Sequence, residues 1–141
     1  MNIVGNNITY SVGQEVSYVD ITVNWTTING VKCQCIDYNV DFATLSTGLE
    51  VVSAWRQAVE ETKVTGEKSY LLINAASLSG FSSESRKLVA EYLKENKAYY
   101  HTLYSVSNDK MMVIAANLVK LLFGINIKAV SKYEDIKGFG S

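Results

Sequence analysis

Apolar and polar positions alternate along the first forty residues with the period of two that is typical of a half-buried β-strand. One series occupies residues 8–12 and a second residues 19–25. Asn29-Gly30 separates the second series from a third, at residues 31–38. Because both residues of this dipeptide tolerate positive φ, it is the strongest short signal for a hairpin turn. The pattern predicts an N-terminal β-hairpin.

From residue 45 the apolar spacing changes to three or four, as in an amphipathic helix. Residues 47–50 fit a capping box, which predicts that this helix begins at Ser46 or Thr47. Gly66 lies in the segment that ends it. The continuous apolar run at residues 70–73 then predicts a strand that is buried on both faces.

The second half continues this alternation of helices and strands. A helix opens at residues 82–85 and ends near Asn96, and a tyrosine-rich strand covers residues 98–106. Asn108-Asp109 caps a third helix at residues 110–123, with Gly124 at its C′ position. A last strand at 125–130 and a short helix at 131–136 complete the series. We predict a single α/β domain over residues 1–141, with helices packed on a mixed sheet.

Composition narrows the class of function. The 141 residues are 48% apolar and 19% charged, with a net charge of -1, which indicates a globular domain rather than a nucleic-acid-binding protein. No apolar run is long enough to span a membrane, and no signal peptide is visible at the N-terminus. Two cysteines make no disulfide framework. We expect a cytoplasmic protein.

Three segments resemble the STAS and CRAL-TRIO-like families. Residues 71–86, LLINAASLSGFSSESR, are similar to the "L-L-x-D-x-x-x-L-x-G-x-S-x-E-A-R" segment of small bacterial STAS-like proteins related to sporulation anti-sigma-factor antagonists. Residues 99–123 and 127–135 are similar to the strands and helices that close that fold. The resemblance implies a STAS-like mixed sheet and a regulatory, protein-binding role.

The resemblance also implies a switch loop. In phosphorylatable STAS antagonists the regulated serine precedes a helix, and Ser82 and Ser83 occupy that place here, with Asn74 at the end of the preceding strand. The sequence departs from the pattern because Phe81 stands where an aspartate is expected. The alternative is structural: a serine that caps the helix and an asparagine that satisfies loop backbone groups.

No set of residues assembles a catalytic or metal site in the sequence. Cys33 and Cys35 point to one face of a strand without further ligands nearby, which is typical of buried thiols. His101 is the only histidine, and no nucleophile and acid stand in a recognisable order around it. We therefore expect that the protein is not an enzyme and that it binds no metal and no cofactor. A weaker hypothesis is an enzyme that uses His101.

The third helix is the most apolar segment. Lys110, Asn117 and Lys120 form one narrow polar stripe on it. We predict an interaction surface that consists of Asn117 and Lys120 from this polar stripe and of the apolar residues that flank it, Val113, Ala116 and Leu121. Such a surface needs a neighbouring helix, another subunit or an apolar ligand as cover, unless the chain itself buries it.

Two functions from different classes follow. The first is a non-catalytic regulatory domain that binds a protein partner, as a homodimer. The alternative is a carrier or sensor of an apolar, lipid-like ligand, which requires an internal apolar pocket of at least a few hundred Å³.

Overall fold

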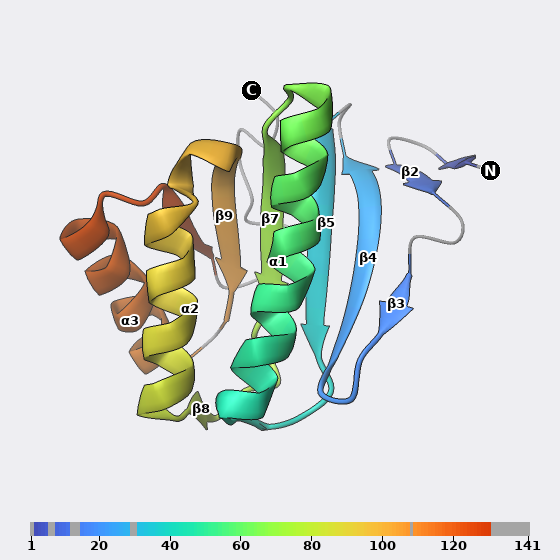
Figure 1. Ribbon diagram of the computed structural model, residues 1–141. Helices are drawn as coiled ribbons and strands as arrows, with labels where there is room; N and C mark the ends of the chain where they lie inside the picture. The colour runs from blue at the N-terminus through green and yellow to red at the C-terminus, as the bar shows by residue number, and fades with distance from the viewer. Residues whose placement is uncertain (1, 6–7, 12–14, 29–30, 108, 131–141) are drawn as a thin grey trace.

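The computed structural model describes residues 2–5, 8–11, 15–28, 31–107 and 109–130, which form one sheet with three helices (Figure 1). Seven strands follow one another in the order β1-β2-β4-β5-β7-β9-β10, and β3 pairs with β4 as the eighth. Their bounds are β1 (Asn2–Gly5), β2 (Ile8–Ser11), β3 (Val16–Ser17), β4 (Ile21–Ile28), β5 (Val31–Tyr38), β7 (Ser69–Asn74), β9 (Tyr100–Val106) and β10 (Ile127–Val130). A small parallel pair joins β6 (Phe42–Ala43) to β8 (Gly80–Phe81).

The sheet is mixed, as the sequence predicts. Strands β1, β2, β4 and β5 pair antiparallel, whereas β5, β7, β9 and β10 are parallel. The register of β4 and β5 reaches Ile28 opposite Val31, which confirms the predicted hairpin. Asn29 and Gly30 themselves lie outside the described residues.

Each parallel strand is added next to the previous one, so the chain always crosses over in the same direction. The crossovers are α1 (Leu45–Thr65), α2 (Ser83–Glu95) and α3 (Lys110–Phe123). Because crossovers have one hand, a sheet that grows in one direction collects its helices on one face. Figure 1 shows α1 and α2 in front of the strands, and side chains of α3 pack against the same core.

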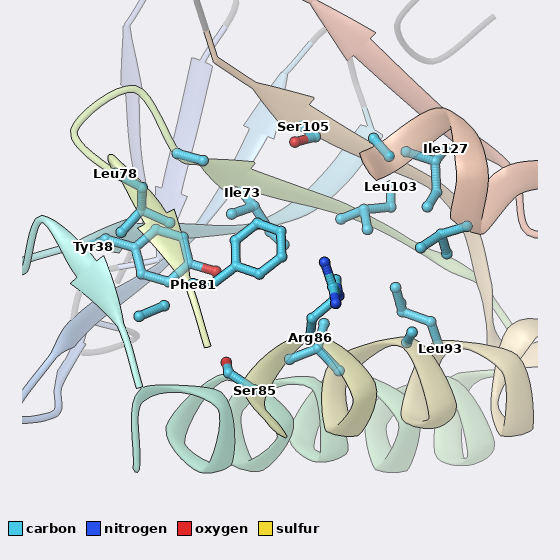
Figure 2. A pocket seen from close by; sticks show the side chains of 16 residues that line it. Tyr38, Ile73, Leu78, Phe81, Ser85, Arg86, Leu93, Leu103, Ser105 and Ile127 are labelled. Carbon is cyan, nitrogen blue, oxygen red and sulfur yellow. The ribbon is translucent and has the colours of Figure 1, made fainter. Parts of the chain in front are cut away.

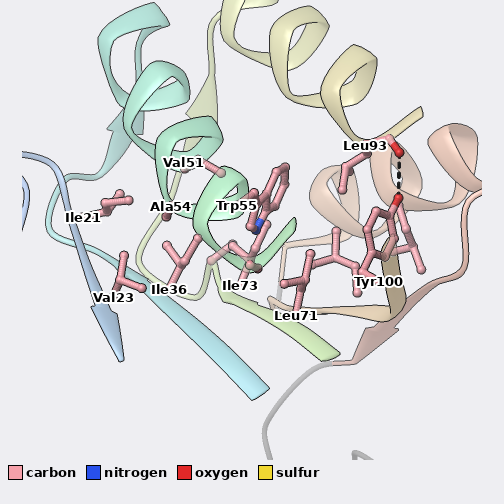
Figure 3. Close-up of a cluster of buried hydrophobic side chains, with 14 of the residues drawn as sticks. Ile21, Val23, Ile36, Val51, Ala54, Trp55, Leu71, Ile73, Leu93 and Tyr100 are labelled. Carbon is pink, nitrogen blue, oxygen red and sulfur yellow. Dashed lines mark hydrogen bonds between the residues drawn. The ribbon is translucent and has the colours of Figure 1, made fainter. Parts of the chain in front are cut away.

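The larger core lies between the helices and this face of the sheet (Figure 3). Trp55, only 1% exposed, is its largest fully buried side chain and stacks on Tyr92 of α2. Leu71 and Ile73 of β7 belong to this core, whereas Tyr70 and Leu72 belong to a second cluster with residues of β5 and β9. The predicted burial of residues 70–73 on both faces is therefore confirmed.

The helix bounds agree with the predictions except at the start of α1. Its N-cap is Thr44, not Ser46 or Thr47, because Thr47 at N3 completes a capping box with the Thr44 backbone and side chain. Gly66 ends α1 with φ of 76°. Ser82 and Asn96 cap α2, and α3 has the predicted bounds, followed by Gly124 at φ of 65°.

The remaining predictions differ in detail or lie outside the described residues. A 3-10 turn, η1 (Lys97–Tyr99), precedes β9, which therefore begins two residues later than predicted. The last strand begins at Ile127 rather than at residue 125. Residue 108 of the α3 cap and the short helix at 131–136 lie outside the described residues. Among the described helices, none is long and apolar enough to cross a membrane.

Candidate functional site: an apolar cavity and the outer face of α3

A cavity of about 110 Å³ lies between the sheet, α2 and α3, next to the loop that leads from β7 into α2 (Figure 2). Most of its lining is apolar, with side chains from all of these elements. The apolar lining residues are Ala43, Ile73, Ala75, Leu78, Phe81, Val89, Ala90, Leu93, Leu103, Ala116, Val119 and Ile127. The cavity is apolar but smaller than the few hundred Å³ that a lipid-like ligand requires, so it has room only for a small apolar molecule.

Four polar residues complete the lining: Tyr38, Ser85, Arg86 and Ser105. Arg86 is the only charged one, and its guanidinium lies 5.9 Å from the centre of the Phe81 ring. Burial raises the pKa of the Tyr38 phenol, so this group is neutral at physiological pH. The cavity thus combines apolar walls with a single cation and neutral hydroxyls.

The outer face of α3 is the second unusual feature. Ile114 and Leu118 are each 51% exposed and Leu121 is 80% exposed. The spacing of four and three residues places them on one side of the helix. We call these three residues the α3 stripe. Exposed large apolar side chains in a row are typical of an interaction surface.

The predicted interaction surface is divided by the structure. Asn117, Lys120 and Leu121 are exposed, whereas Val113 is half-buried and Ala116 faces the cavity. Ile114 and Leu118 also belong to the exposed side of α3 and were not predicted from the sequence. The signal was present in their spacing from Leu121, but the pattern of a helix that is apolar nearly all round does not say which side the sheet covers.

The residues of the predicted switch loop have structural contacts. The Ser82 hydroxyl accepts a hydrogen bond from the Ser85 amide, at 3.1 Å, and so acts as the N-cap of α2. Ser83 is exposed. The Asn74 side chain donates to the Asp37 carboxylate at 3.0 Å and accepts from the Ala76 amide, which ties the ends of β5 and β7 together.

The two cysteines lie on the sheet face opposite the helices. Their sulfur atoms are 3.9 Å apart, and both side chains are buried. A hydrogen bond with Cys35, together with burial, raises the pKa of the Cys33 thiol, so this group is protonated and unreactive at neutral pH. No cluster of three or more metal-ligating side chains occurs within the described ranges.

His101 does not face the cavity. Its ring stacks on Tyr70 with 4.4 Å between ring centres, and its Nδ1 lies 2.8 Å from the Thr102 hydroxyl. Asn126 donates to the same hydroxyl and to the backbone oxygen of His101. These contacts hold the ring at the start of β9, next to a tyrosine and a threonine.

Comparison with solved structures identifies the fold. The chain is similar to the crystal structure of an uncharacterized protein of the DUF3478 family, with a SpoIIAA-like fold, from Shewanella loihica PV-4. The TM-score is 0.64 and the identity 11%, over 85% of this chain and 93% of that chain. The protein therefore has a SpoIIAA-like, that is STAS-like, fold, which confirms the predicted fold class. No family model and no curated protein matches the sequence.

Proposed function

We propose that this protein is a non-catalytic regulatory domain that binds a protein partner through the α3 stripe. The observation that carries the proposal is the exposure of Ile114, Leu118 and Leu121 on one side of a helix. Burying three such side chains is worth several kcal/mol, at about 1.5–3 kcal/mol for each one fully removed from water. The STAS-like fold supports a regulatory role by analogy with antagonists of anti-sigma factors.

The charges on α3 indicate the chemistry of the partner. The helix carries Lys110 and Lys120, both exposed, and no carboxylate anywhere in its sequence. A second copy of the same helix would bring further lysines to this surface. A partner that presents an apolar patch flanked by carboxylates would complement both the stripe and the lysines. We therefore propose an acidic, apolar segment of another protein as the occupant.

A capture experiment with matched variants tests this proposal. The protein is used as bait in an extract of its source cell, as wild type, as Leu118→Asp/Leu121→Asp and as Val64→Asp. Val64 is an 85% exposed apolar residue of α1, so its substitution adds the same charge away from the stripe. We expect one partner that is retained by Val64→Asp, is lost with the double variant, and binds in purified form more weakly as salt increases.

Two other results would overturn the choice of partner. If light scattering shows a dimer that Leu118→Asp/Leu121→Asp converts to a monomer, a second copy occupies the stripe. If the wild type sediments with vesicles of anionic phosphatidylglycerol and the double variant does not, the occupant is a lipid surface. Capture of a partner that binds all three proteins equally also places the interface elsewhere.

A second candidate function is carried by the cavity: binding of a small apolar ligand. Its apolar walls come from α2, α3 and the sheet, and Ala116 leaves space where a larger residue would fill it. In a ¹⁵N NMR titration, 1-hexanol should shift amides around Leu103 and Ala116 in the wild type. Ala116→Phe should abolish these shifts while its spectrum remains folded. Equal shifts in both proteins would place the bound alcohol outside the cavity.

A further inference from the structure

We infer that the cavity selects small apolar acids and that Arg86 holds their carboxylate. This inference rests on the second proposed function, that the cavity binds a ligand. It goes further because it assigns the charge of the ligand, its size and the residue that recognises it.

The position of Arg86 is the first argument. Figure 2 shows its side chain rising from α2 toward the space between Phe81 and Leu103, and it lies among the cavity-lining residues. No carboxylate pairs with Arg86 in the part of the chain that the structure describes, and no Asp or Glu lines the cavity. An anion that enters the cavity therefore meets one unneutralised guanidinium, a group whose flat fork of donors matches a carboxylate.

Two hydroxyl groups support this orientation. Tyr38 and Ser105 line the cavity, and neither side-chain oxygen has a hydrogen-bond partner among the described residues. Both can donate to an anionic oxygen, and neither adds a competing negative charge, since the raised pKa of Tyr38 keeps its phenol protonated. The polar part of the lining is thus able to donate to an anion at several points.

The volume of the cavity limits the size of the apolar part of the ligand. A dry protein cavity of about 150 Å³ accommodates benzene. The cavity here is somewhat smaller, at about 110 Å³, so we expect it to hold a body of roughly four to six carbon atoms. Arg86 is exposed to solvent, which allows the carboxylate to remain partly hydrated and reduces the loss of its hydration energy. Hexanoate has the required length.

The charge of Arg86 should make a modest but measurable difference. An exposed ion pair is weakened by solvent and salt. We therefore expect hexanoate to bind about tenfold more tightly than 1-hexanol at low ionic strength, with a smaller preference as salt is added. The apolar tail is nearly the same in the two compounds, so their ratio isolates the contribution of the head group.

The test is a ¹⁵N NMR titration of hexanoate and 1-hexanol into three proteins: wild type, Arg86→Gln and Lys87→Gln. Lys87 is an exposed cation next to Arg86 on α2 that does not line the cavity. It therefore controls for the loss of one positive charge. We expect the preference for hexanoate to fall to about one in Arg86→Gln, with 1-hexanol affinity nearly unchanged, and to persist in Lys87→Gln.

The outcomes separate the inference from the function on which it rests. If 1-hexanol binds as tightly as hexanoate, or if Arg86→Gln keeps the preference, selection by Arg86 is wrong although the cavity still binds apolar ligands. If Lys87→Gln loses the preference to the same extent, the effect is general electrostatics and the inference is again overturned. If neither compound binds the wild type, both the inference and the proposed ligand-binding function fail.

Discussion

Helices α1 and α3 lie on the same face of one sheet, yet they are packed very differently. Nine residues of α1 are buried, and the helix contacts β4, β7, β9 and α2. Its approach to α2 is so close that a Cβ at Gly48 would lie 2.7 Å from the Ser85 hydroxyl. Helix α3 packs mainly on β10, the last strand of the sheet, and keeps the α3 stripe exposed.

The difference follows from the order of the strands rather than from the composition of the helices. Helix α1 crosses the middle of the sheet and packs closely against α2, whereas α3 is the last crossover and covers an edge. In sequence α3 is the more apolar of the two. An apolar helix at a position that buries it incompletely is poorly explained by stability alone. This contrast supports a role for α3 in binding.

The largest expected loss of stability comes from removing a core side chain of α1. Trp55 is 1% exposed, so Trp55→Ala should lower the free energy of unfolding by about 3–5 kcal/mol. Leu118→Ala in the α3 stripe, where the side chain is 51% exposed, should change it by less than about 0.5 kcal/mol. Urea denaturation of both variants measures this. A large loss for Leu118→Ala would mean that the stripe is covered in the free protein.

Two alanine-to-leucine substitutions compare the space available next to α1 and next to α3. Ala54 of α1 is 1% exposed in the close-packed core, so Ala54→Leu should cost about 1–3 kcal/mol of stability. Ala116 of α3 lines the cavity, so the added atoms of Ala116→Leu have space to occupy. We expect that variant to be neutral or up to about 1 kcal/mol more stable, because it buries apolar surface. Equal destabilisation of both would contradict an open cavity.

The sequence predicted elements that depend on local periodicity and missed features that depend on distant contacts. The bounds of α3 and the caps of α2 follow from neighbouring residues, and they were correct. The start of α1 was wrong because the capping box joins Thr44 to Thr47 instead of covering residues 47–50, and the Thr47 hydroxyl also donates to the Asp20 carboxylate at 2.7 Å. That carboxylate is 27 residues away, beyond the reach of a local motif.

The candidate site was less accessible to sequence reasoning than the fold. The apolar character of α3 was evident, but its exposed side depends on the final order of strands, so Ile114 and Leu118 were missed and Ala116 was placed with the exposed flanks. The cavity requires residues from β5 to β10 to meet. Arg86 carried no signal because a lone cation in a helix is ordinarily a solvated surface residue.

The smallest expected change in stability comes from removing the hydroxyl group of a tyrosine. Two tyrosines are compared, one in the packed region and one at the cavity. The Tyr100 hydroxyl donates to the Leu93 backbone oxygen at 2.9 Å, whereas the Tyr38 hydroxyl has no such partner among the described residues. Tyr100→Phe should therefore cost about 1 kcal/mol at neutral pH, since it leaves a buried carbonyl unpaired. Tyr38→Phe should be nearly neutral. Similar losses in both variants would indicate that Tyr38 is also hydrogen-bonded in solution.

Tyr38 and Tyr100 also predict how the stability of the protein changes with pH. Burial raises the pKa of both phenols above the ordinary value near 10. Each phenol therefore contributes stability that is fully present below pH 10 and is lost as the pH rises toward the folded-state pKa, because the unfolded chain releases its proton first. Urea midpoints should fall as the pH rises above about 10, and less steeply in Tyr100→Phe than in the wild type. An unchanged slope would show that Tyr100 ionises without opening the core, which would place it nearer to solvent than its hydrogen bond under α2 implies.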